Sequence, residues 1–156
     1  MRIYIASPLH TLECKGEIIR VVEYLRSLGH EVYSPMELKI PNAWDISNRE
    51  WAKKVYDNDI NELNKADVIV CIYRGFKFAG GTGTAWELGY ARAKNKDVIV
   101  LCTDITSKQS LMIINSAIVV MPYEEYKEAW SRYLLTQLPN PDFEIPYIHP
   151  DLQDQS

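Results

Sequence analysis

The chain has 156 residues, of which 47% are hydrophobic and 24% are charged, and its formal net charge is −4. This length and apolar content fit one globular domain with a full core. The sequence isoelectric point near 5.4 excludes a typical nucleic-acid-binding surface, which needs a basic stripe that the lysines and arginines do not form here. Small molecules are the expected partners.

The N-terminal part predicts a strand, a helix and a second strand. Residues 2–6 form a short apolar run typical of a strand, and Gly29 is a natural stop for the helix that follows. A second strand is expected over residues 30–33. Within the helix, the apolar positions recur at helical spacing: Ile18, Val22 and Leu25.

A loop over residues 35–41 should lead into a long helix. Ser47 and Glu50 match the S-x-x-E capping box with which helices begin. Five apolar residues then fall on one face of this helix: Ala52, Val55, Tyr56, Ile60 and Leu63.

The next strands are continuous apolar runs. Residues 68–73 and 98–102 lack the alternation of a half-exposed strand, as expected for parallel strands covered on both faces. A shorter run over residues 117–121 predicts a fifth strand, and residues 123–138 predict the last helix. The remaining residues contain four prolines: Pro139, Pro141, Pro146 and Pro150.

Strands and helices therefore alternate about five times, which predicts an α/β fold. We expect a single doubly wound, flavodoxin-like domain over residues 1–138, with a five-stranded, mainly parallel sheet, and a proline-containing tail over residues 139–156. Ligands bind such sheets beyond the carboxyl ends of the strands. The loops after Ala6 and Tyr73 are therefore the expected walls of a site.

Cysteine and histidine patterns argue against disulfides and metal sites. The cysteine count is odd and lacks C-x-x-C spacing, which is typical of reduced thiols in a cytoplasmic protein, and the histidines are too dispersed for metal ligation. No stretch has the features of a signal peptide or approaches the roughly 20 apolar residues of a membrane span. We expect a cytoplasmic protein without a metal or a membrane segment. The residues concerned are Cys14, Cys71, Cys102, His10, His30 and His149.

Glu87 follows a glycine-rich turn at the start of a predicted helix, and two interpretations are open. Thr84 and Glu87 form a T-x-x-E capping box, in which the glutamate bonds back to the N-cap amide. Alternatively, helix-start amides keep Glu87 ionised, and Gly81 and Gly83 let a ligand approach the backbone, so that Glu87 acts as a nucleophile.

Asp59 and Tyr4 are the other polar side chains at apolar positions. Asp59 shares a helical face with Val55 and Leu63, where burial would raise its pKa and suit it to donate a proton. The alternative is that the helix breaks near Asn58 and Asp59 caps a following short helix. For Tyr4, ordinary packing with a hydrogen-bonded hydroxyl is the simplest interpretation.

The glycine-rich turn does not predict a dinucleotide or P-loop site. Gly81 and Gly83 suggest a G-x-G-x-x-G fingerprint, but Trp86 stands where the third glycine is required, and the turn follows the third strand rather than the first. No Walker A lysine follows the glycines. We therefore expect no cofactor.

Three segments, in their order and spacing, resemble the nucleoside 2-deoxyribosyltransferase family. They are IYIASP at residues 3–8, YDND at residues 56–59 and GTAWELGYA at residues 83–91, of which the last is the most specific. The resemblance covers roughly residues 2–126. It implies a retaining transfer of 2-deoxyribose from one nucleobase to another without a cofactor.

The resemblance also implies roles for single residues. Glu87 would attack C1′ of a 2′-deoxynucleoside and form a deoxyribosyl ester, which a second base then attacks. Asp59 matches the position that handles protons on the departing and incoming base, and Tyr4 matches the position that orients the nucleophile. The implied substrate-binding residues follow the first and third strands: Ser7, Pro8, Leu9, Gly81, Thr82 and Gly83.

Two positions depart from the family pattern. Family members often carry an aspartate six residues before the nucleophile, next to the base, and here that position is Gly81. An asparagine contributed by a neighbouring subunit is matched by Asn115 only if the alignment shifts by about two residues. With this asparagine, the resemblance implies a homo-oligomer, a dimer or hexamer with shared active sites.

Two further functions remain open. One is a hydrolase that cleaves a (deoxy)nucleoside 5′-monophosphate with water, with the phosphate held by helix-start amides and the hydroxyls of Ser7, Thr82 or Thr84. Gly81 favours this alternative, whereas the lack of arginine and lysine in residues 80–90 disfavours it. The other is a nucleotide-binding module without catalysis.

Overall fold

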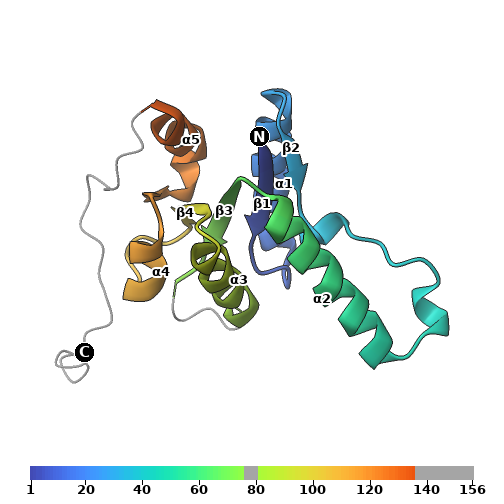
Figure 1. Ribbon diagram of the computed structural model, residues 1–156. Helices are drawn as coiled ribbons and strands as arrows, with labels where there is room; N and C mark the ends of the chain where they lie inside the picture. The colour runs from blue at the N-terminus through green and yellow to red at the C-terminus, as the bar shows by residue number, and fades with distance from the viewer. Residues whose placement is uncertain (76–80, 136–156) are drawn as a thin grey trace, which may run out of the picture.

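Five parallel strands form the centre of the protein (Figure 1). The computed structural model describes residues 1–75 and 81–135. Every strand pairing is parallel, and the order β2-β1-β3-β4-β5 is the flavodoxin-like order that the sequence predicts. The strands are β1 (Arg2–Ala6), β2 (Glu31–Tyr33), β3 (Val68–Tyr73), β4 (Asp97–Cys102) and β5 (Val119–Pro122).

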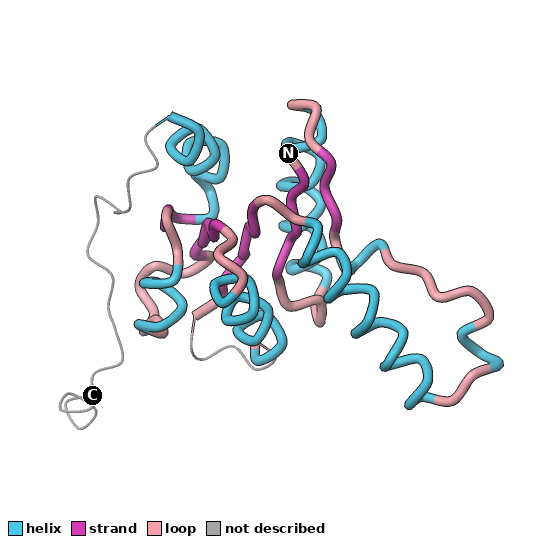
Figure 2. The backbone as a smooth tube through the Cα atoms, in the orientation of Figure 1, coloured by secondary structure: helices cyan, strands magenta, loops and turns pink. Residues whose placement is uncertain are grey.

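Helices cover both faces of the sheet, which makes three layers (Figure 2). One face packs against α1 (Leu12–Ser27) and α5 (Tyr126–Leu135), and the other against α2 (Asn48–Lys65), α3 (Thr82–Ala93) and α4 (Leu111–Ser116). Because side chains alternate along a strand, neighbouring residues of β1 enter different cores. Ile3 and Ile5 pack with α1, whereas Tyr4 lies under α2 and α3.

Most element boundaries agree with the sequence. Gly29 follows α1 with a φ of 86°, the left-handed conformation expected after a helix end. The fifth strand runs over Val119–Pro122 rather than residues 117–121, and Tyr123–Glu125 form a 3₁₀ turn before α5. The predicted loop after β2 contains two short 3₁₀ turns, Pro35–Glu37 and Ala43–Asp45.

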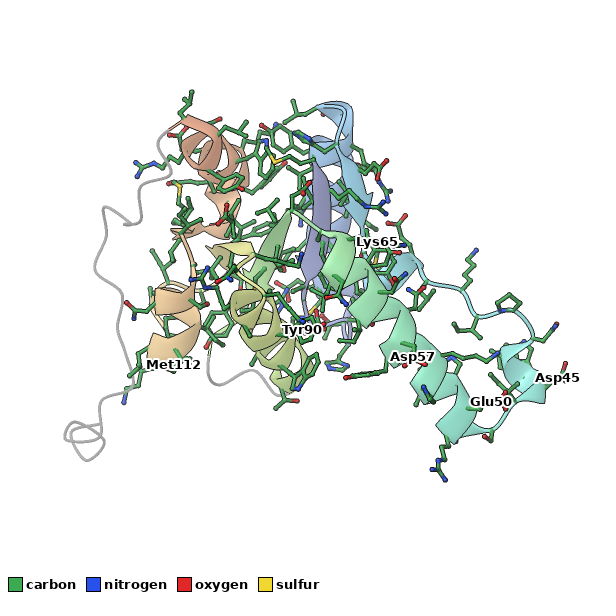
Figure 3. The ribbon with its side chains drawn as sticks, viewed as in Figure 1. Asp45, Glu50, Asp57, Lys65, Tyr90 and Met112 are labelled. Carbon is green, nitrogen blue, oxygen red and sulfur yellow. The ribbon has the colours of Figure 1, made fainter. Side chains whose placement is uncertain are left out.

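Helix α2 begins as the capping box predicts, because the Ser47 side chain accepts a hydrogen bond from the Glu50 amide at 3.2 Å. Its first turns, residues 48–54, are exposed and extend beyond the sheet, with Asp45 and Glu50 at the outer end (Figure 3). Only the second half packs on the sheet, so the predicted apolar face is not buried along its full length.

The helix is continuous from Asn48 to Lys65, so the alternative break near Asn58 is wrong. Asp59 is therefore an interior helical residue and not a cap. Among residues 1–75 and 81–135, no helix is long and apolar enough to cross a membrane. The proline-containing tail predicted over residues 139–156 lies outside the described residues.

Candidate active site

Helix α3 begins earlier than the capping-box interpretation requires. Its first residue is Thr82 and its N-cap is Gly81, whose carbonyl accepts the Ala85 amide at 3.0 Å. Thr84 is inside the helix and is 5% exposed. Glu87 therefore lies in the second turn and does not bond back to an N-cap at Thr84, so this interpretation is wrong. The glycine turn, not Thr84, therefore marks the start of α3.

A cavity of about 320 Å³ lies between α2 and α3. Figure 3 labels Asp57 and Tyr90 on these two helices. Asp59 from α2 and Glu87 from α3 both line the cavity, so the structure brings two carboxyl groups together from segments far apart in sequence. The full lining is Tyr56, Asp59, Ile60, Leu63, Gly83, Trp86 and Glu87.

Tyr4 lies beneath this cavity on β1, with no exposed surface. Its hydroxyl lies near Glu87 and lowers the pKa of that carboxyl group. Tyr4 Oη and Glu87 Oε2 are both buried without a hydrogen-bond partner among the described residues. Burial, and after it the negative charges of Glu87 and Asp59, raise the pKa of Tyr4, so its hydroxyl stays protonated.

Asp59 is held by two residues that the sequence analysis did not select. The Tyr33 hydroxyl donates to Asp59 Oδ1 at 2.7 Å, and Asn58 Nδ2 donates to the Tyr33 oxygen at 2.7 Å. Tyr33 is the register partner of Tyr4 in the neighbouring strand, and their ring centroids are 5.4 Å apart. The signal in the sequence was the alternation that places both tyrosines on one face of the sheet.

Burial raises the pKa of both carboxyl groups. For Glu87 the pKa rises to about 7, chiefly through burial, and the negative charge of Asp59 adds to the shift. The expectation that helix-start amides favour the ionised Glu87 carboxylate is therefore wrong in direction, because burial raises its pKa. Burial also raises the pKa of Asp59, against the hydrogen bonds from Tyr33 and Asn58. The negative charge of Asp59 and the burial of Glu87 therefore act in the same direction on the Glu87 pKa.

Aromatic side chains form one wall of the cavity. The rings of Tyr56 and Trp86 are 5.8 Å apart, and Trp86 stacks on Tyr90 at 5.4 Å with an interplanar angle of 14°. Tyr56 and Trp86 remain 55% and 48% exposed. An accessible aromatic surface next to two carboxyl groups suits a planar heterocycle linked to a group that reacts with a carboxylate.

The predicted residues after β1 do not line this cavity. The Ser7 hydroxyl donates to the Pro8 carbonyl at 3.2 Å, and both residues are at least partly buried. Leu9 packs against the core on the other face of the sheet, with α1 and α5. Their roles in substrate binding stay predictions.

The glycine-rich turn and α4 contribute differently. Gly83 lines the cavity, Gly81 caps α3, and Thr82 is exposed in the first turn. Asn115 is exposed on α4, and its Nδ2 donates to the Leu111 carbonyl at 2.8 Å. The neighbour contact at Asn115 and the homo-oligomer also stay predictions.

A larger cavity of about 430 Å³ lies at the opposite end of the sheet, where β1 and β2 begin. Its charged side chains are paired: Arg2 contacts Glu31 at 3.3 Å and Glu62 at 3.4 Å. These contacts join β1 to β2 and α2. The cavity between α2 and α3 is therefore the better candidate for chemistry.

Comparison with known protein families gives a match over most of the chain. The family model described as nucleoside 2-deoxyribosyltransferase matches residues 3–129, which include both carboxyl groups and the cavity between α2 and α3. No curated protein matches the chain.

Several solved structures share the fold of this chain. A 2-deoxyribosyltransferase from Bacillus psychrosaccharolyticus is 29% identical, with a TM-score of 0.79, over 92% of this chain and 100% of that one. A 2-deoxyribosyltransferase from Leishmania mexicana is 19% identical, with a TM-score of 0.62, over 88% and 99%. A CMP N-glycosidase from Clostridium botulinum is 22% identical, with a TM-score of 0.56, over 85% and 99%. The last two likenesses show the fold alone.

Proposed function

The chain belongs to the nucleoside 2-deoxyribosyltransferase family, and we propose that it transfers 2-deoxyribose between nucleobases through a covalent ester on Glu87. The observation that carries the proposal is the cavity between α2 and α3. Asp59 from α2 and Glu87 from α3 both line it, beside the aromatic wall. The substrates are 2′-deoxynucleosides and free nucleobases, and no cofactor takes part.

The reaction has two displacements at C1′. In the first, a Glu87 carboxylate oxygen forms a bond to C1′, the N-glycosidic bond breaks, and the departing base takes a proton from Asp59. In the second, a nitrogen of the acceptor base attacks C1′, the ester bond breaks, and Asp59 accepts the proton that the acceptor loses. Two inversions give net retention.

The reactive form of the enzyme differs from its resting form. Because burial raises the pKa of Glu87 to about 7, much of the resting protein carries a protonated Glu87 at neutral pH. The first displacement needs the opposite arrangement, with Glu87 ionised and Asp59 protonated. The Tyr4 hydroxyl, which lowers the pKa of Glu87, and the positive charge that develops at C1′ both favour the ionised Glu87 carboxylate.

This arrangement predicts two pH profiles. For bases that leave only when protonated, kcat/KM should fall as the pH rises, because Asp59, whose pKa is raised by burial, then loses the proton that it must donate. For bases that leave without protonation, kcat/KM should rise through about pH 7 as Glu87 ionises. The measurement is kcat/KM against pH for one substrate of each kind. Identical profiles would contradict the division of roles.

A hydrolase acting on a 5′-monophosphate is the second candidate. The observation that favours it is the start of α3, where the N-cap residue Gly81 supplies no side-chain hydrogen bond, so that the amides of the first turn would hold the 5′-phosphate. It would use Glu87 in the same way, with water as the acceptor.

One assay separates the two candidates. Deoxyinosine or thymidine is incubated with and without free adenine or cytosine, and the products are separated. We expect new deoxynucleoside to form at a rate that saturates with the acceptor base, while hydrolysis falls as the acceptor competes with water. Turnover only of the 5′-monophosphate, without an exchange product, would replace the transferase by the hydrolase.

A further inference from the structure

The hydrogen bonds around Asp59 reach from an edge strand to the middle of α2. We propose that Tyr33 and Asn58 are positioning residues that hold Asp59 by its Oδ1, so that Asp59 exchanges its proton with the bases through Oδ2. The inference rests on the proposed function of Asp59, and it assigns which oxygen transfers the proton and which residues fix it.

The direction of the two hydrogen bonds supports this assignment. A tyrosine hydroxyl has one hydrogen to donate. Because Asn58 Nδ2 donates to the Tyr33 oxygen at 2.7 Å, the single Tyr33 hydrogen points to Asp59 Oδ1, which lies 2.7 Å away. Asp59 Oδ1 must therefore accept. When Asp59 carries a proton, that proton belongs on Oδ2.

Packing against Tyr4 fixes the Tyr33 ring on the face of the sheet that α2 covers. Tyr33 pairs in register with Tyr4, and the two rings lie 5.4 Å apart with an interplanar angle of 34°. Tyr33 also packs, partly buried, against the core formed by the sheet with α2 and α3. The ring contacts therefore hold the Tyr33 hydroxyl in place independently of Asp59. The hydrogen bond to Asp59 consequently costs little side-chain entropy.

Several charged or titratable groups act on Asp59, and their effects differ. Tyr33 from β2 lowers its pKa by hydrogen bonding, whereas Glu62, on the same helix as Asp59, raises it by charge. Tyr4 from β1 and Glu87 from α3 face the same space. Loss of the Tyr33 hydroxyl removes a group that opposes burial, so the pKa of Asp59 should rise further.

The kinetic test is Tyr33→Phe, which keeps the ring and removes only the hydroxyl. For bases that need protonation, kcat should fall roughly 10- to 100-fold, the usual worth of a hydrogen bond to a charged group, with little change in KM. For bases that leave without protonation, kcat should change less than about twofold. Equal losses for both kinds of substrate, or no loss, would overturn the proposal.

The chain offers a matched control in Tyr133→Phe. Tyr133 on α5 donates to Asp97 Oδ2 at 2.8 Å, so this variant also removes a tyrosine–aspartate hydrogen bond, but on the other face of the sheet. It should leave kcat unchanged for both kinds of base. If Tyr133→Phe also lowers kcat selectively for bases that need protonation, the effect of Tyr33→Phe reflects general stability.

A second readout does not depend on turnover. The pKa of Asp59 is followed by carboxyl-carbon NMR in the free protein, where it should rise in Tyr33→Phe and stay constant in Tyr133→Phe. An unchanged pKa overturns the proposal. If the pKa rises and the parent protein exchanges no bases, the hydrogen bond stands and the proposed function fails.

Asn58→Ala tests the orientation of the tyrosine hydroxyl. Without the amide donor the Tyr33 hydrogen is free to rotate away from Asp59, so the same selective loss of kcat should appear, smaller than in Tyr33→Phe. If Asn58→Ala keeps the parental ratio of kcat values between the two kinds of substrate, Asn58 has no positioning role.

Discussion

Glu87→Gln is expected to abolish base exchange, with a loss of several orders of magnitude in kcat. The amide keeps the size of the side chain but cannot form the deoxyribosyl ester. The measurement is the rate of new deoxynucleoside formation at saturating acceptor. Glu124→Gln, an exposed substitution before α5, is the control and should retain parental activity. Residual exchange above a tenth of the parent in Glu87→Gln would exclude Glu87 as the nucleophile.

A folding defect can be separated from this loss. The pKa of Glu87 is raised by burial from its ordinary value to about 7, so the parent protein loses stability as the pH rises through this range. A glutamine does not titrate. Glu87→Gln should therefore be at least as stable as the parent at about pH 8, as measured by urea denaturation.

Asp59→Asn should show the second largest effect. For bases that need protonation, kcat should fall about 10²- to 10⁴-fold, the usual contribution of a general acid. Bases that leave without protonation should be affected far less, because their departure depends only on the attack of Glu87 on C1′. The measurement is kcat for a series of leaving bases, with the parent protein and with Asp59→Asn.

Asp57→Asn is the matched control for Asp59→Asn. Asp57 is two residues away on the same helix, but it is exposed and pairs with Lys53 at 2.6 Å. It should have parental kinetics. Equal slowing of every base by Asp59→Asn would instead mean that Asp59 supports the structure of α2.

Strands β3 and β4 could be predicted because they are continuous apolar runs, and the strand order because strands and helices alternate along the chain. Ser47 also predicted the start of α2 correctly. The same kind of signal failed at Thr84, because a capping box is local and the start of α3 is set by a glycine turn and by packing on the sheet. Two similar motifs therefore gave one correct and one wrong boundary.

The sequence also brought Glu87 and Asp59 to attention, and the structure places both at one cavity. It could not select Tyr33, because the hydrogen bond to Asp59 spans 26 residues and depends on the register between β1 and β2. The raised pKa of Glu87 was equally hidden, since it depends on how deeply α2 and α3 bury the carboxyl group.

The strand that carries Tyr33 has only three residues and one neighbour, β1. Edge segments with few hydrogen bonds open more often than the centre of a sheet. Each opening of β2 withdraws the hydroxyl from Asp59, while Tyr4 and Glu87 stay on better-anchored elements. Warming should thus impair proton delivery to the base at temperatures where attack on the sugar still proceeds, so the enzyme would become more selective for easily released bases before it melts.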